Sequence, residues 1–339
     1  MANGVLNNKK FYYVKRLLVA ILILFSNIIF STENREPYKT WFGDPDIQGI
    51  WTNATLTTLE RPDHFKKLIV SEDEARAAAQ RASSESYAYD NQLEVGEEIT
   101  DARDPGGYNT AWMDPGAELF KLNGEYRTSI VAFPKNGKIP WDRTKATEFF
   151  NQRRKNRSKR KDHPELRGVG ERCVVGFGSS GGPPMMNVLY NNFYQIVQSP
   201  GYVMIMAEMV HDARVIRLKG EHLPKIMKPW LGDSIGHWEG NTLVVETTNF
   251  NPQHIFRGGL RHFFAITEEA KITERFTRIS NDQILYRFFV EDFDMYSNVW
   301  AGEMPFRAVD DKIYEYACHE GNYAMANILA GAREEDRRK

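Results

Sequence analysis

The sequence predicts a mainly β protein, built as an antiparallel barrel or sandwich with helical and loop insertions in its N-terminal half. From Phe193 onward, short runs rich in β-branched and aromatic residues recur between turn-forming residues, which is typical of antiparallel sheets. The strands do not alternate with long helical segments, which argues against a doubly wound fold. Aromatic residues make up 12% of the chain, enough for a large core and more than a disordered chain carries.

The first 31 residues predict a signal peptide. Four basic residues between positions 9 and 16 precede the apolar stretch Leu17 to Phe30, and no acidic residue occurs before Glu33. The stretch is shorter than the ~20 residues that a membrane-spanning helix needs. Because Ile29 fits the small-residue cleavage rule poorly, an uncleaved membrane anchor is the alternative. We therefore predict an exported protein, periplasmic or secreted, that meets a membrane only through an uncleaved leader.

The charge balance gives no reason to expect nucleic acid or anionic lipid as a partner. The chain has 44 basic and 45 acidic residues, and removal of the leader leaves 40 against 45, a net charge of −5. Only the stretch 153–161 (RRKNRSKRK) is strongly basic. We interpret it as a solvated helix end that runs into a loop.

Residues 32–190 are predicted to supply an opening strand, two helices and long loops that pack on the sheet. The first helix has a capping box, because Ser71 is followed three residues later by Glu74. The expected elements are a strand entered at Gly49-Ile50-Trp51, a helix over 71–82, a connection over 83–118, a strand over 127–133 ended by a turn at 135–138, a helix from 144 to about 159, and a loop over 164–184.

Residues 191–339 are predicted to form the antiparallel β core. Alternation is clearest where Ile284, Tyr286, Phe288 and Val290 fall on one face of a strand. The expected strands cover residues 193–198, 202–208, 213–218, 242–248, 270–279, 283–291 and 313–318.

The two cysteines, Cys173 and Cys318, predict one disulfide in an exported protein. The bond would close a loop of 145 residues. From the loop-closure entropy, we expect it to stabilise the folded state by roughly 3–5 kcal/mol at best. The alternative is a reactive thiol at Cys318, next to His319. We favour the disulfide because export removes the reducing environment.

Two resemblances to known families support export and β architecture. Gly49-Ile50-Trp51 resembles the Gly-x-Trp signature of lipocalins and other calycins, which implies a barrel with Trp51 plugging one end beside a small ligand. A longer resemblance is to a broad family of exported bacterial proteins with a G-x-W-E-G-x-T-L-V-V-E-T core; it covers most of the mature chain and implies no particular reaction. The segments that carry it are 106–116, 127–140, 171–173, 181–216, 230–250 (WLGDSIGHWEGNTLVVETTNF) and 315–329.

Two motifs, one catalytic and one nucleotide-binding, match the sequence by residue pattern but lack the structural context that each requires. Residues 178–182 (GSSGG) match the G-x-S-x-G nucleophile elbow, and the glycines at 176, 178 and 181 match G-x-G-x-x-G. Both motifs need a helix directly afterwards, which Pro183 and Pro184 disfavour. We predict a glycine-rich structural loop. The eight histidines lack metal-ligand spacing, so no metal or cofactor is expected.

Three polar positions are candidates for acid–base chemistry. If the strand from Tyr202 continues through Val215, His211 is the single polar group on an apolar wall, either catalytic or a hydrogen-bonded core residue. His319 and Glu320 suit a general base and its orienting carboxylate, or else they end a strand anchored at Cys318.

Glu274 lies among apolar residues, where a carboxylate is costly unless it is paired. It therefore has either a raised pKa suited to catalysis or an arginine partner, for which we considered Arg275, Arg278 and Arg287.

The leading functional hypothesis is a cofactor-free acid–base enzyme, an isomerase, lyase or hydrolase acting on a small organic molecule. Its catalytic candidates are His211, His319, Glu320 and Glu274, and its ligand-binding candidates are Trp51, Trp238, Arg214 and Tyr316. The alternatives are a non-enzymatic binding protein for an apolar or aromatic ligand and an envelope structural protein.

Overall fold

A computed structural model describes residues 38–90, 113–259 and 262–339. The predicted signal peptide and part of the predicted connection over 83–118 lie outside these ranges and stay predictions. Residues 39–339 form one compact unit. Every helix in the described ranges is too short or too polar to cross a membrane.

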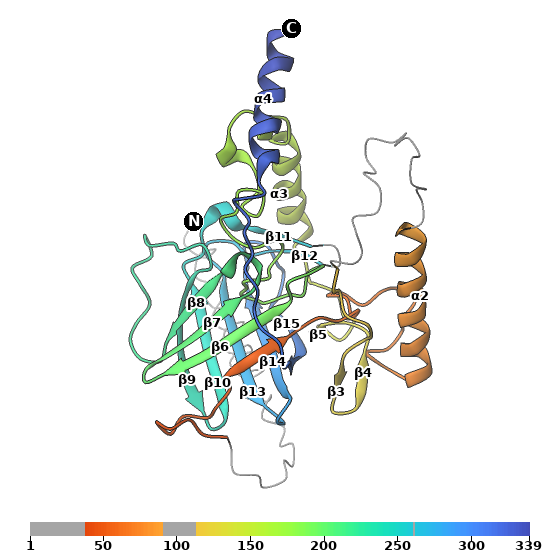
Figure 1. Cartoon of the computed structure of the whole chain (residues 1–339), viewed down its shortest axis with the longest axis vertical. Coiled ribbons are helices and arrows are strands. Elements are labelled where there is room, and N and C mark those ends of the chain that lie inside the picture. The colour runs from red at the N-terminus through yellow and green to blue at the C-terminus, as the bar shows by residue number, and fades with distance from the viewer. Residues whose placement is uncertain (1–37, 91–112, 260–261) are drawn as a thin grey trace, which may run out of the picture. The chain divides into compact units, whose positions relative to one another are not determined.

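Nine strands close into a barrel, which confirms the predicted fold class (Figure 1). The strand order is β1-β6-β7-β8-β9-β10-β13-β14-β15, and pairing of β15 with β1 closes the ring. All neighbours are antiparallel except β8 and β9, which the long connection 218–232 allows to run parallel. The barrel strands are β1 (Gly49–Thr52), β6 (Phe193–Ser199), β7 (Tyr202–Ala207), β8 (Ala213–Arg217), β9 (Asp233–Glu239), β10 (Thr242–Thr248), β13 (Lys271–Arg278), β14 (Gln283–Glu291) and β15 (Trp300–Ala308).

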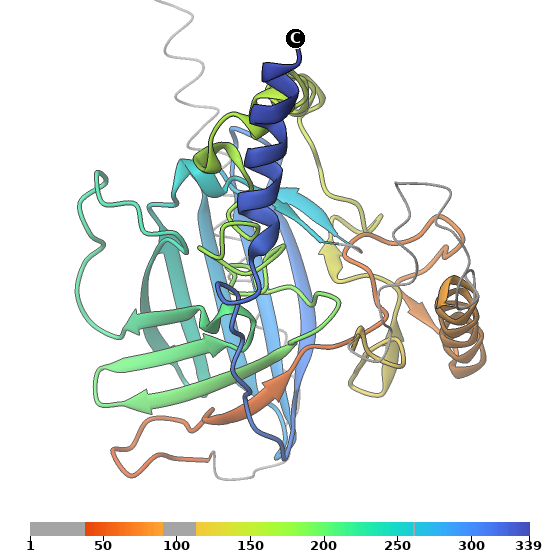
Figure 2. The ribbon, with the colours of Figure 1, turned by 45° about the horizontal axis from the view of Figure 1, so that its top comes forward.

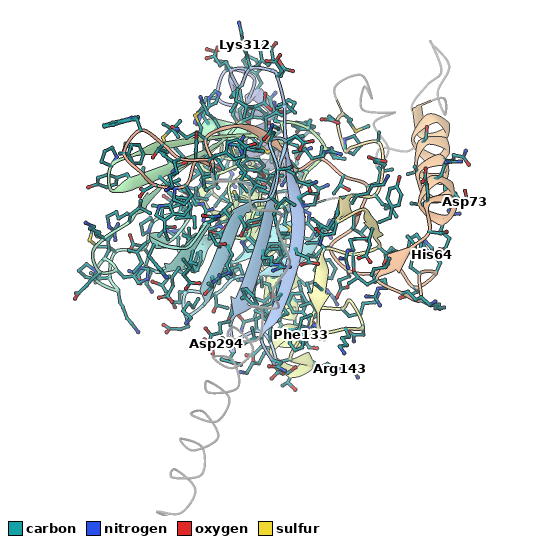
Figure 3. The ribbon with its side chains drawn as sticks, turned by 90° about the horizontal axis from the view of Figure 1, so that it is seen from below. His64, Asp73, Phe133, Arg143, Asp294 and Lys312 are labelled. Atoms are coloured by element: carbon teal, nitrogen blue, oxygen red, sulfur yellow. A yellow bond between two sulfur atoms is a disulfide. The ribbon has the colours of Figure 1, made fainter. Side chains whose placement is uncertain are left out.

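Smaller elements flank the barrel. One group lies to one side, where Figure 3 shows His64 and Asp73. Another group, with β11, β12, α3 and α4, lies at one end of the barrel (Figure 1). These elements are β2 (Ile69–Val70), α2 (Glu72–Asp90), β3 (Lys121–Leu122), β4 (Glu125–Arg127), β5 (Val131–Phe133), α3 (Arg143–Lys155), β11 (Phe256–Gly258), β12 (Phe263–Ala265) and α4 (Tyr323–Arg337). The described ranges also contain the 3-10 turns η2 (Ser158–Lys161), η3 (Pro164–Leu166), η4 (Met209–His211) and η5 (Pro252–His254).

The capping box predicted for the first helix is confirmed. Ser71 N donates to Glu74 Oε2 at 2.9 Å, and Glu74 N donates to Ser71 Oγ at 3.3 Å. The second helix ends at Lys155, earlier than predicted, because the chain tightens into η2.

The strand predicted over 127–133 is wrong as one piece. It divides into β4 and β5, and the residues between them change partners: Thr128 N donates to Leu68 O, whereas Ile130 N donates to Thr58 O. The chain thus leaves the small β2-β4-β3 sheet and joins β15 of the barrel sheet.

The strand predicted over 313–318 is also wrong. This segment crosses the outside of the barrel between β15 and α4 (Figures 1 and 2), and no described strand pairs with it; Tyr314 N lies 3.4 Å from the side chain of Glu208, at Oε1. The last barrel strand is β15, which the sequence did not reveal because Gly302 and Pro305 interrupt its pattern.

Aromatic side chains fill the interior of the barrel. The predicted face of β14 is confirmed, with its four alternating residues fully buried. The ring centroid of Tyr286 lies 5.0 Å from the centroids of both Phe276 and Phe306. Trp300 packs against Phe288, with a centroid–centroid distance of 5.6 Å. A barrel of this size is just wide enough for side chains to fill. Its interior is therefore a packed core.

Candidate functional site

A glycine- and proline-rich segment, residues 179–188, is buried along its whole length and packs into the barrel; we name it the plug loop. No helix follows Ser180, as predicted, and Ser179 Oγ donates to Pro184 O at 2.6 Å. Barrel tyrosines hold the loop by its backbone: Tyr194 donates to Ser180 O at 2.8 Å, and Met185 N donates to the Tyr286 hydroxyl at 2.9 Å. The glycines and prolines are thus structural.

Tyr286 connects the plug loop to a buried ion pair between Arg214 and Glu274. The two guanidinium–carboxylate distances are 2.6 and 3.0 Å, and both side chains are at most 2% exposed. The Tyr286 hydroxyl donates to Glu274 Oε1 at 2.7 Å. Burial and the Glu274 carboxylate raise the pKa of Tyr286 well above its usual value, so this hydroxyl stays a donor. Two candidates that the sequence nominated separately therefore form one pair with the geometry of a structural tie.

The three partners expected for Glu274 were wrong. Arg278 donates to backbone oxygens, among them Asp46 O at 3.1 Å, and the other two arginines point away from the core. Successive residues of a strand face opposite sides, so Arg275 lies outside, where it pairs with Glu239 at 2.9 Å. Arg287 likewise pairs with Glu303 at 3.0 Å.

Arg214 reaches the core because the predicted continuous strand through His211 is wrong. β7 ends at Ala207, and Val210 and His211 adopt positive φ values of 61° and 53° in the intervening turn. The turn shifts the alternation, so that Arg214 and Ile216 face inward. His211 is exposed instead, with Nε2 3.1 Å from Tyr314 O.

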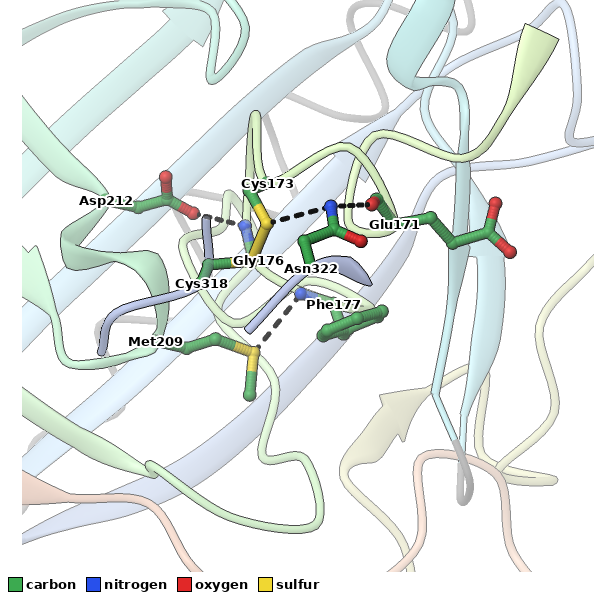
Figure 4. The surroundings of a disulfide bond; sticks show 8 residues. All are labelled: Glu171, Cys173, Gly176, Phe177, Met209, Asp212, Cys318 and Asn322. Carbon is green, nitrogen blue, oxygen red and sulfur yellow. Dashed lines mark hydrogen bonds between the residues drawn. A yellow bond between two sulfur atoms is a disulfide. The ribbon is translucent and has the colours of Figure 1, made fainter. Parts of the chain in front are cut away.

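The predicted disulfide between Cys173 and Cys318 is confirmed, with a Cα–Cα distance of 5.7 Å (Figure 4). His319 and Glu320 follow it in an exposed turn. Trp51 is buried in the core, where its Nε1 donates to Ile47 O at 3.2 Å. Trp238 and Tyr316 are half-buried. A cavity that described residues form outside the barrel is lined by none of these side chains, nor by His211.

That cavity, which we name the cleft, has a volume of about 450 Å³. Its walls come from α3, from Arg160 of η2, from the loop 168–178 and from η5 with β11. No lining residue belongs to a barrel strand. Its aromatic side chains are Phe149, Phe177 and Phe256, and its charged side chains, apart from a buried histidine, are Arg153, Arg160 and Glu171.

Helix α3 presents one face to the cleft. Asp142 caps it by accepting from Thr144 N and Lys145 N. Four lining residues then follow at the i, i+3, i+4 and i+7 spacing of a single helical face: Phe149, Gln152, Arg153 and Asn156. This spacing was the signal in the sequence, hidden because the helix is polar nearly all round.

The loop 168–178 is held rigidly from behind (Figure 4). The disulfide ties it to the C-terminal segment, and Asn322 Nδ2 donates to Glu171 O at 2.9 Å. Gly176 N donates to Asp212 Oδ2 at 2.7 Å, and Phe177 N lies 3.2 Å from the sulfur of Met209. The wall of the cleft is therefore fixed by contacts from two other parts of the chain, the C-terminal segment and the turn before β8.

The cleft is electropositive. The Arg153 guanidinium lies over the Phe256 ring, 3.9 Å from its centroid. Burial and the nearby Arg160 lower the pKa of Arg153, and Glu171 acts in the opposite direction. Glu171, the one carboxylate of the lining, already accepts from Arg160 and Arg167, each at 2.9 Å. Burial lowers the pKa of His254 to about 2, so that ring is neutral.

Asp212 lies behind the floor of the cleft. Burial raises the pKa of this carboxyl to about 6, although the hydrogen bond from Gly176 N and the nearby Arg257 act in the opposite direction. The packing needs glycine: a Cβ on Gly176 would lie 2.2 Å from Ser180 Oγ, and one on Gly181 would lie 2.9 Å from Asp212 Oδ2.

Within the described ranges, the His, Cys, Asp and Glu side chains do not gather in threes around a point suited to a metal ion. Comparisons with protein-family models, with curated proteins and with solved structures give no match for this chain. The family resemblances of the sequence therefore stay predictions.

The buried ion pair predicts a non-additive pair of substitutions. Arg214→Met leaves Glu274 buried without its partner and should lower the free energy of unfolding by about 3–5 kcal/mol. The double variant Arg214→Met/Glu274→Leu should be more stable than the single variant, because no unpaired charge remains buried. Guanidinium unfolding curves of the parent, the single variants Arg214→Met and Glu274→Leu, and the double variant measure this; a double variant as unstable as the sum of the two single ones would contradict it.

The raised pKa of Asp212 predicts a pH dependence. Its folded pKa of about 6 lies above the unfolded value, so the stability it contributes is complete in acid and is lost as the pH rises through about 6. Asp212→Asn removes this loss, so between about pH 4 and pH 7 the variant should gain up to about 3 kcal/mol relative to the parent.

Chemical denaturation at a series of pH values tests this expectation. Asp63→Asn is the control, because the hydrogen bond from Lys138 lowers the pKa of exposed Asp63. Equal pH profiles for Asp212→Asn and the parent would refute the assignment.

Proposed function

We propose that the protein binds a small organic anion with an aromatic or apolar body in the cleft. The observation that carries the proposal is a cavity of about 450 Å³ in which three phenylalanines stand beside two arginines and one carboxylate. Its volume is in the range of small-molecule sites, about 300–1,000 Å³. The aromatic side chains suit the body of the ligand, and the arginines suit its charged end.

Arg153 is the residue best placed to receive the anionic group. No carboxylate of the described residues forms an ion pair with it, and Arg160 adds repulsion nearby. A carboxylate, sulfonate or phosphate would supply the missing counter-charge through paired hydrogen bonds to the guanidinium. Stacking on Phe256 holds the guanidinium plane in position before the ligand arrives, which reduces the entropy lost on binding.

The chemistry of the cleft supports binding more strongly than acid–base catalysis. Glu171 is engaged by two arginines, and the neutral His254 is too weak a base to take up a proton near neutral pH. The residues on which the enzyme hypothesis was centred, His211, His319 and Glu320, lie on exposed surface outside the cleft. The proposal therefore follows the binding-protein alternative, with a more anionic ligand than the sequence suggested.

The disulfide supports a place of action outside the reducing cytosol. We infer a periplasmic or secreted protein, because such a bond is rarely maintained among cytosolic thiols. Small organic anions reach either compartment.

Calorimetric titration with 2-naphthoate tests the proposal. Arg153→Gln should weaken binding about 10-fold, as expected for loss of one hydrogen bond to a charged group. Arg154→Gln is the matched control: it removes the same charge from the next residue of α3, which does not line the cleft, and should change the affinity less than about 2-fold.

The neutral analogue 2-acetylnaphthalene keeps the aromatic body and lacks the charge. The parent should bind this analogue about 10-fold more weakly than 2-naphthoate. The Arg153→Gln variant should bind the two compounds with equal affinity. Equal binding of both compounds to the parent, or equal effects of the two substitutions, would overturn the assignment of the anion site.

A further inference from the structure

The end of α3 and the turns after it carry a dense set of positive charges. Seven of the nine residues over 153–161 are basic. Three of them are engaged: Arg153 stacks on Phe256, Arg160 pairs with Glu171, and Lys161 pairs with Glu335. The others are exposed and form no ion pair with a described residue; we name them the basic patch, which consists of Arg154, Lys155, Arg157 and Lys159.

The fold accounts for only half of this patch. Cations in the last turn of a helix interact favourably with its dipole, which covers Arg154 and Lys155. Arg157 and Lys159 lie beyond the end of α3 and gain nothing from it. Four exposed like charges within six positions repel one another, so a partner of opposite charge would relieve the repulsion.

The neighbouring helix α4 does not provide that partner, although it carries three carboxylates near its end. Beyond the pair of Glu335 with Lys161, its carboxylates are used within α4: Glu334 pairs with Arg337 and Arg338. Asp336 pairs with Arg333 in the same way. Among the described residues of α4, no carboxylate is left to pair with the patch.

An exposed apolar side chain accompanies the patch. Leu166 is 48% exposed on η3, the turn that packs against η2 and follows it in the chain. Figures 1 and 2 show these turns beside α4, at the same end of the barrel as α3. Cations beside an exposed apolar side chain suit the interface of a membrane. Anionic headgroups would pair with the cations, and the leucine would insert into the upper acyl region.

We propose that the basic patch docks this protein on an anionic lipid surface. The balanced net charge of the whole chain does not oppose this, because screening limits electrostatic attraction to about 10 Å and only the local charge acts. Nucleic acid is the other common polyanion, but the disulfide belongs to an oxidising compartment and Leu166 offers nothing to a phosphate backbone.

The test is co-sedimentation of the full chain with phosphatidylcholine vesicles, with and without phosphatidylglycerol. One variant changes Arg154, Lys155, Arg157 and Lys159 to Gln. The matched control changes four exposed lysines on other surfaces to Gln: Lys67, Lys135, Lys219 and Lys225. Both variants lose the same charge and keep the same N-terminal residues, and thermal unfolding establishes that both are folded.

Each patch cation is expected to contribute about 5-fold to the affinity for an anionic bilayer, so the patch variant should bind at least about 100-fold more weakly than the parent. The control should stay within about 3-fold, and high salt should abolish the difference. Equal losses in both variants, an unchanged affinity of the patch variant, or tighter binding of the parent to duplex DNA than to the anionic vesicles would each overturn the proposal.

Discussion

The structure depends on a pair of charges that the barrel keeps out of water. Arg214 and Glu274 are enclosed by aromatic rings, and desolvating two ions costs several kcal/mol each unless their geometry and hydrogen bonds compensate. Here the guanidinium is bidentate, and Tyr286 satisfies a further position of the carboxylate. The same tyrosine accepts from Met185 N, so the ion pair and the plug loop are parts of one network.

This network determines where a ligand site can be. Plug loop and aromatic rings fill the barrel, and the cleft forms outside it, where α3, the loop 168–178 and η5 with β11 meet. The disulfide and Asn322 fix that loop from the C-terminal side, while Asp212 fixes it from the start of β8. The cleft and the basic patch share α3: one face of the helix lines the cavity, and its end carries the patch.

Local patterns in the sequence were enough to predict the barrel, the capping box at Ser71, the disulfide and the structural role of the glycine-rich loop, because each depends on spacing within a short segment or on the only two cysteines. The site was harder to predict. Because of one turn at residues 209–211, Arg214 faces the core and His211 faces outward, the reverse of the prediction. The turn needs a positive φ at Val210, which a β-branched residue does not predict. The cleft joins segments up to about a hundred residues apart, and no local period connects them.

A crystal structure of the protein with 2-naphthoate bound tests the central claim, that the ligand site lies outside the filled barrel. The account predicts the naphthalene ring against Phe149 and Phe256, the carboxylate at the Arg153 guanidinium, and a barrel interior with Arg214, Glu274 and Tyr286 unmoved. A ligand found between the barrel strands, with the plug loop displaced, would contradict it.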